Sequence, residues 1–122
     1  KLAPQAQNND MINTNLGVLK HRSGKLDEAL EHFKTAEKLN SKNDLLLFNY
    51  SMLLSAMEKN SEALDKINKA ITINPKDPEY YNLKGSILIG QSNYEDAERT
   101  ILERLLYITI KQSNWILTYR LH

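Results

Sequence analysis

The sequence contains no cysteine and no excess of charge of either sign, and its apolar runs are short. Without cysteine it has neither a disulfide framework nor a thiolate metal site, which is compatible with a reducing, intracellular compartment such as the cytoplasm. The 16 basic and 15 acidic residues nearly cancel, so there is no electrostatic case for binding nucleic acid or an anionic membrane. Apolar runs such as residues 45–48 are far too short to insert into a bilayer, and nothing resembles a signal peptide.

Catalytic and cofactor-binding patterns are missing as well. The histidines His21, His32 and His122 do not stand at metal-ligand spacing. Gly85 and Gly90 have the spacing of a phosphate-binding loop, but the lysine that such a loop requires is absent. No nucleophile is paired with a base. We therefore expect no enzyme activity, no cofactor and no metal site.

What the sequence does contain is an internal repeat. Ala29, Ala63 and Ala97 follow one another at intervals of 34 residues. Two further columns share this spacing, a small one of Gly17, Ser51 and Gly85 and a large apolar one of Phe33, Ile67 and Ile101. Small residues are needed where two helices approach closely, and larger ones fill the gap to the next repeat. This period and this order are typical of antiparallel helix pairs that stack into a solenoid.

The repeat also predicts where the helices lie. We expect helices at about residues 9–22, 26–39, 43–57, 60–73, 77–90 and 94–107, followed by a separate helix at about 112–121. Asn74-Pro75 closes the second repeat, because proline lacks an amide donor and disfavours helix in the residue before it. Residues 1–8 lack periodicity and are predicted to be a leader or linker. Because the chain starts at Lys1 without methionine, we expect a processed product or part of a longer protein.

The repeat units resemble the tetratricopeptide repeat family. The first unit resembles it through Leu16-Gly17, residues 24–30, Phe33 and Ala36. The third unit resembles it through Tyr81, Gly85, residues 93–97 and Ile101. The second unit is less regular and resembles it through Tyr50, Ser51, Ala63, Ile67, Ala70 and Pro75. The resemblance covers roughly residues 9–106 and implies an all-α, right-handed superhelical solenoid of three helix pairs plus a C-terminal helix. Its signature residues are packing residues, so it is specific for fold and uninformative about function.

The resemblance implies a binding surface, because in this family the first helix of each repeat lines a concave groove. The residues predicted to bind a partner are Asn15, Val18, Leu45, Phe48, Asn49, Met52, Asn82 and, near the C-terminus, Trp115. Asn15 and Asn49 stand one repeat apart, where the family uses asparagine to hydrogen-bond an extended peptide backbone. Phe48 and Met52 would make the groove apolar and adaptable. The alternative for these apolar residues is packing within the chain, and asparagine is abundant in this sequence.

A chaperone clamp, one specialisation of the family, is not favoured. Family members that hold the acidic C-terminus of heat-shock chaperones use lysine, arginine and asparagine on the inner face. Asn49 resembles that pattern, but Thr14 and Val18 replace its first lysine and asparagine, and Glu79 and Leu83 replace its later basic pair. Glu79 would repel the carboxylates of such a ligand.

These observations lead to one prediction of organisation and function. We predict a repeat region at residues 9–111, with repeats at about 10–43, 44–77 and 78–111, and a capping helix or the start of a truncated fourth repeat at 112–122. The predicted function is a protein–protein interaction module that binds a peptide or partner helix in the concave groove. The alternative is an architectural segment of a longer solenoid in a multi-subunit assembly. The apolar C-terminal end predicts self-association or a neighbouring subunit at the last helix.

Overall fold

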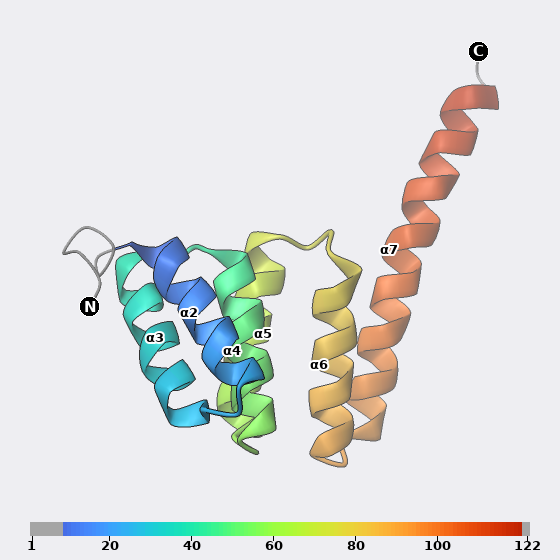
Figure 1. Ribbon diagram of the computed structural model, residues 1–122. Helices are drawn as coiled ribbons and strands as arrows, with labels where there is room; N and C mark the ends of the chain where they lie inside the picture. The colour runs from blue at the N-terminus through green and yellow to red at the C-terminus, as the bar shows by residue number, and fades with distance from the viewer. Residues whose placement is uncertain (1–8, 121–122) are drawn as a thin grey trace.

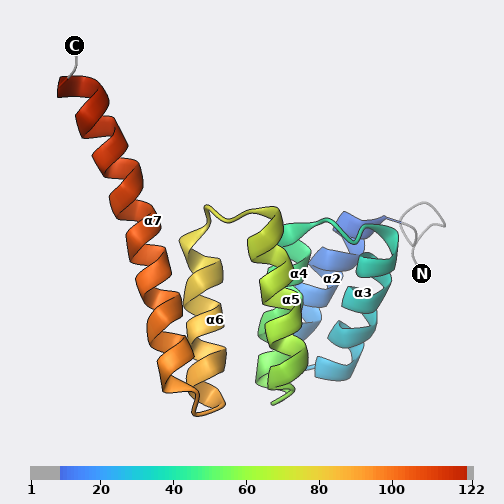
Figure 2. The same ribbon diagram turned by 180° about the vertical axis from the view of Figure 1, so that it is seen from behind.

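The computed structural model describes residues 9–120, and the side chains of residues 9–112. The described residues form helices and turns without a strand. The helices are α2 (Asp10–Arg22), α3 (Leu26–Leu39), α4 (Asp44–Ala56), α5 (Asn60–Ile73), α6 (Pro78–Gly90) and α7 (Tyr94–Arg120). They form three antiparallel pairs, α2–α3, α4–α5 and α6–α7, which follow one another from one end of the molecule to the other (Figure 1 and Figure 2). The predicted all-α solenoid is confirmed.

The first helix of each pair begins with the same capping interaction. Asn9, Asn43 and Asp77 lie one repeat apart, and each side-chain oxygen accepts a backbone N–H from the first turn of the helix that follows. Such a cap satisfies one of the amide groups that a helix start leaves unpaired. The 34-residue period therefore fixes where α2, α4 and α6 begin.

The turn within each pair also repeats its backbone geometry. Gly24, Glu58 and Ser92 stand at the same position of successive repeats, with positive φ angles of 78°, 61° and 60°. This left-handed conformation is free of steric cost only for glycine. Only the first repeat has glycine at this position, so the sequence pattern does not reveal that the three repeats share this turn.

The small and large columns meet as the sequence predicts. Ala29, Ala63 and Ala97 are all buried. A Cβ atom added to Gly17 would lie 2.5 Å from the Phe33 ring, so the glycine lets that ring press against the backbone of α2. In the second pair, the hydroxyl of Ser51 donates a hydrogen bond of 2.7 Å to the carbonyl oxygen of Ala63. A small residue in the first helix thus sets the close approach of the two helices in each of these pairs.

Polar contacts close the first two repeats. Asn40 Nδ2 donates to Asp10 Oδ2 over 3.2 Å, and one repeat later Asn74 Nδ2 donates to Asp44 Oδ2 over 3.3 Å. Asp44 Oδ2 also accepts the Tyr80 hydroxyl of the third repeat over 2.7 Å. Burial acts to raise the pKa of Asp44, but the hydrogen bonds from Tyr80 and Asn74 outweigh it and hold that pKa below its ordinary value.

The third repeat lacks this closure, and α7 is one continuous helix. Ile108 takes the place of Asn40 and Asn74, and Pro78 takes the place of Asp10 and Asp44. Without a residue that ends the helix, the backbone continues through 108–111 to Arg120, and α7 extends beyond the end of α6 (Figure 1). The expected separate helix at 112–121 was therefore wrong. The assignment of residues 112–122 as a capping element stays a prediction.

Candidate functional site

The predicted binding residues of α2, α4 and α6 form one surface, which we call the first-helix face. Asn15, Leu45 and Asn82 are exposed there, and Val18, Phe48, Asn49 and Met52 are half-buried. Because they stand at equivalent positions of successive repeats, they lie along the same side of the array. Exposed Met11 and Ile89 add apolar surface at its two ends. The structure thus brings all the predicted site residues together except Trp115, whose side chain lies outside the described residues.

The two asparagines differ in how they are held. Asn49 Nδ2 donates to the carbonyl oxygen of Leu45, one turn earlier, over 3.1 Å. This bond aligns the amide along α4 and uses one of its two N–H groups. Asn15 is exposed, one repeat earlier on α2. In the third repeat Leu83 takes the equivalent position, so the pair of asparagines ends at α4.

Phe48 belongs partly to the interior. Its ring centroid lies 5.0 Å from that of Tyr80, with the two rings inclined by 32°. Tyr80 is buried and its hydroxyl is bonded to Asp44, so this ring is fixed. Phe48 therefore links α4 to α6 with one side, and its remaining surface is open to the first-helix face. The side of the Phe48 ring that contacts Tyr80 therefore packs within the chain, which was the alternative to partner binding for this residue.

Thr14 does not belong to the exposed surface. It is buried, and its hydroxyl donates to the carbonyl oxygen of Asp10 over 2.7 Å. Its position in the repeat placed it on the inner face, but a β-branched hydroxyl satisfied by its own helix can turn inward. Of the positions that a chaperone clamp would use, the structure exposes the acidic Glu79 and buries Thr14.

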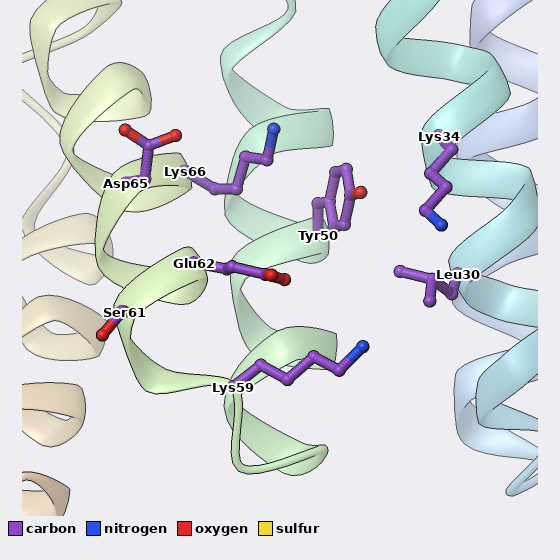
Figure 3. A pocket seen from close by; sticks show the side chains of 8 residues that line it. All are labelled: Leu30, Lys34, Tyr50, Lys59, Ser61, Glu62, Asp65 and Lys66. Carbon is purple, nitrogen blue, oxygen red and sulfur yellow. The ribbon is translucent and has the colours of Figure 1, made fainter.

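A pocket of 530 Å³ lies on another surface, between α3 and α5. Figure 3 shows Tyr50 of α4 at its floor, Leu30 and Lys34 on the α3 side, and residues of α5 opposite them. A smaller pocket of 250 Å³ is lined by equivalent residues one repeat later, including Leu64, Asn68, Lys84, Asp96 and Arg99. The pocket is thus a groove that any two neighbouring repeats create, and only its lining differs.

The floor of the larger pocket joins two repeats. Lys66 Nζ of α5 lies 2.7 Å from Glu37 Oε1 of α3 and 4.9 Å from the centroid of the Tyr50 ring. Burial, reinforced by the carboxylates of Glu37 and Glu62, raises the pKa of Tyr50 to about 12. The tyrosine is therefore neutral at physiological pH, and the ion pair beside it is structural.

Replacing Lys66 with methionine should lower the free energy of unfolding by about 1–2 kcal/mol, because Glu37 is then left partly buried without its cation. Urea denaturation followed by circular dichroism measures the change. Lys69→Met is the matched control, since the Lys69–Asp65 pair is exposed and 3.5 Å long, and should change stability by at most about 0.5 kcal/mol. Equal effects at the two positions would show that the Lys66–Glu37 pair does not join the repeats.

Helix α7 carries an apolar stripe that sequence reasoning missed. Leu102, Leu106 and Ile110 are exposed and lie one turn apart. The equivalent residues of the first two repeats are all polar and exposed, namely Lys34, Asn68, Lys38, Thr72, Lys42 and Lys76. Part of the stripe borders a shallow pocket of 480 Å³ lined by Arg99, Leu102, Glu103, Leu105, Leu106 and Thr109. A column-by-column comparison of the repeats would have found this stripe.

Among the described residues, no group of three or more acidic or histidine side chains could hold a metal ion. Within residues 9–120, no helix is both long enough and apolar enough to cross a membrane.

Known proteins share this architecture. The chain is 32% identical over 90 residues to an Hsp70-Hsp90 organising protein of Plasmodium falciparum, and the match covers 74% of this chain and 36% of that protein. The crystal structure of MamA matches 88% of this chain and 63% of its own, with a TM-score of 0.81 at 17% identity. The first tetratricopeptide domain of Spaghetti (RPAP3), bound to the HSP90 peptide SRMEEVD, matches 79% of this chain and 76% of its own, with a TM-score of 0.75 at 20% identity.

The family assignment follows from the residues that are matched. The chain spans only about a third of the organising protein, and the structural likenesses establish the fold. The family model of the tetratricopeptide repeat, however, matches residues 21–87, more than half of the chain, and this range includes the buried Ala29, Phe33, Ala63 and Ile67 of the columns described above. The chain belongs to the tetratricopeptide repeat family.

Proposed function

We propose that the chain is a protein-interaction module that holds a peptide or partner helix on its first-helix face. The observation that carries the proposal is the placement of Asn15 and Asn49 one repeat apart, beside the apolar surface of Leu45 and Met52. An asparagine amide has both a donor and an acceptor, so it can pair with a peptide backbone whatever the side chains are. Membership of a family of interaction modules supports the same function.

The two parts of the surface would divide the work of recognition. Asn15 and Asn49 would hold the backbone of the ligand, and Asn82, which is equivalent to Phe48, would add an exposed amide in the third repeat. Leu45 and the open side of Phe48 would take apolar side chains of the ligand. Flexible methionine at Met52 would let that surface adapt to more than one sequence. The ligand that fits is therefore an extended or helical segment with apolar side chains.

The chaperone-binding relatives provide a specific test of ligand charge. Their likeness to this chain raises the question of an acidic peptide, but Glu79 is exposed and Thr14 is buried where a clamp would carry basic side chains. We therefore expect the peptide SRMEEVD to bind more weakly than an apolar peptide. Isothermal titration calorimetry with that peptide checks the expectation. A dissociation constant for SRMEEVD of about 1 μM that is also no higher than that of an apolar peptide would contradict it.

Asn49→Ala should weaken a cognate peptide by about 1–2 kcal/mol, because a backbone group of the ligand would lose its partner. The peptide is obtained by selecting a random peptide display library on the purified chain, and its affinity is then measured by calorimetry. The change should leave the melting temperature nearly unaltered, since Asn49 bonds only its own helix in the described structure.

Asn68→Ala is the matched control for this experiment. Asn68 is an exposed helical asparagine on α5. Because α5 is the second helix of its repeat, Asn68 does not belong to the first-helix face. Equal losses of affinity for Asn49→Ala and Asn68→Ala would place the peptide elsewhere. A library selection that yields no binding sequence would count against the proposal as a whole.

The apolar stripe of α7 favours a second function, an architectural segment within an assembly. Large exposed apolar patches in monomeric proteins are uncommon and often mark contact surfaces. We propose that α7 meets a second copy or a neighbouring subunit there. The cytoplasmic location expected from the sequence stays a prediction.

A further inference from the structure

The two ends of the solenoid leave different columns uncovered. Phe33 and Ile67 are 0% exposed, whereas Ile101, their equivalent in the third repeat, is 39% exposed. Phe33 is covered although no repeat precedes it in the described chain. Beyond their own pair, Phe33 and Ile67 are therefore covered by the repeat that follows each of them, and among the described residues no such repeat follows Ile101.

The opposite pattern holds in another column. Leu53 and Ile87 are 0% and 1% exposed, whereas Leu19, their equivalent in the first repeat, is 58% exposed. Ile87 is covered although no further repeat follows it in the described chain. What covers Leu53 and Ile87 is the preceding repeat. The open column of α7 and the open column of α2 are thus the two halves of one kind of junction.

The geometry of an existing junction shows how these halves meet. Phe33 packs on Gly17 within its own pair, and its ring lies 5.7 Å from the ring of Tyr50 in the next repeat. Ile101 packs on Gly85 in the same way, with its Cγ1 atom 3.4 Å from the position of an added Cβ. Its other side, which in Phe33 faces the next repeat, is open. The residue equivalent to Tyr50 in the first repeat is Leu16.

We infer that a second copy of this chain docks its α2 on the open side of α7, so that copies stack head to tail in the register of the repeats. In this arrangement, Ile101 meets Leu16 of the second copy as Phe33 meets Tyr50. Leu19 of the second copy is buried as Leu53 and Ile87 are. The inference deepens the architectural proposal and is independent of peptide binding on the first-helix face.

The groove between repeats adds complementarity to this contact. In the larger pocket Lys34 and Tyr50 line the same groove, and their equivalents at the new junction are Leu102 and Leu16 of the second copy, which are both apolar. In the smaller pocket Leu64 and Leu88 line the same groove. Their equivalents are Glu98 and Lys20 of the second copy, which have opposite charges. Both pairs at the new junction, the apolar Leu102–Leu16 pair and the oppositely charged Glu98–Lys20 pair, are therefore compatible with contact.

The junction also differs from the internal ones in a way that sets its strength. The hydrogen bond from Tyr80 to Asp44 joins the second and third repeats, but Ile12 of the second copy and Pro78 stand at these positions in the new junction, so this bond has no equivalent there. No peptide link holds the two sides together either. The contact is therefore reversible, and because it is heterologous it adds further copies, which form a ring if the rotation closes and an open filament if it does not.

Sedimentation velocity over a range of concentrations up to about 1 mM tests the inference with the full chain. The wild type should grow beyond a dimer as the concentration rises. Leu19→Glu blocks the α2 end and Leu102→Glu blocks the α7 end, and each variant alone should stay monomeric. Both residues are exposed, and circular dichroism establishes that each variant is folded. An equal mixture of the two should form a dimer and nothing larger, because one intact α2 end meets one intact α7 end.

Other outcomes would overturn the inference. A wild type that stays monomeric throughout, or a mixture that does not dimerise, excludes the head-to-tail contact. Self-association of Leu19→Glu without that of Leu102→Glu would point to a symmetric pairing of two α7 helices. Leu45→Glu, on the first-helix face, should assemble like the wild type while losing peptide binding, so the two proposals can fail separately. Loss of assembly in that variant would place the contact on the first-helix face.

Discussion

Phe33→Ala should lower the free energy of unfolding by about 3–5 kcal/mol. The ring is fully buried between Gly17 of its own pair and Tyr50 of the next repeat. Removing the Phe33 ring leaves a cavity beside Gly17, which has no side chain to fill it. It also removes the stacking of Phe33 on Tyr50 between the first and second repeats. Since small domains are stable by only about 5–15 kcal/mol, this change should bring the first repeat close to unfolding. Urea denaturation followed by circular dichroism measures it.

Ile101→Ala serves as the control because it occupies the same column at the other end of the solenoid. Ile101 is partly exposed, so truncation should cost only about 1–2 kcal/mol. A loss as large as that of Phe33→Ala would mean that Ile101 is covered in the isolated chain. Equal small losses at both positions would mean that the first junction is not packed as described.

Ala63→Leu should destabilise the protein by about 1–3 kcal/mol through overpacking. Ala63 is fully buried where α4 and α5 approach each other, and its carbonyl oxygen accepts the Ser51 hydroxyl over 2.7 Å. A leucine side chain at this position must push the two helices apart or adopt a strained rotamer. A thermal melt should show a lower midpoint for the variant.

Ser61→Leu is the matched control for this overpacking. Ser61 lies two residues earlier on the same helix and is exposed, so the change should stay within about 0.5 kcal/mol. Similar melting temperatures for the two variants would contradict the assignment of Ala63 to the interface within the pair.

The candidate site could be predicted only in part from the sequence. The family resemblance, which assigns one face to the first helix of each repeat, predicted one surface for Asn15, Leu45 and Asn82, and all three are exposed. The register could not reveal that Thr14 bonds its own helix or that Phe48 lies against Tyr80. These outcomes depend on side-chain rotamers and on neighbouring helices.

The end of the last repeat could have been predicted more fully. The separate C-terminal helix was expected by extending the period, but Ile108 stands where asparagine ends the earlier helices. Nothing between residues 108 and 111 is a glycine, proline or asparagine, so no local signal ends α7. The local sequence around residue 108 therefore indicates a continuous helix, whereas the 34-residue period wrongly predicted a break there.

The sequence by itself determined the helix pairs, their boundaries up to residue 94 and the columns that form the core. It could do so because caps and close helix contacts demand particular residue types at particular spacings. Only the tertiary structure decided which member of each column is covered. Phe33 and Ile101 occupy the same position and yet differ in exposure, as do Leu53 and Leu19. Burial is a property of two surfaces in contact, and a repeat pattern describes only one of them.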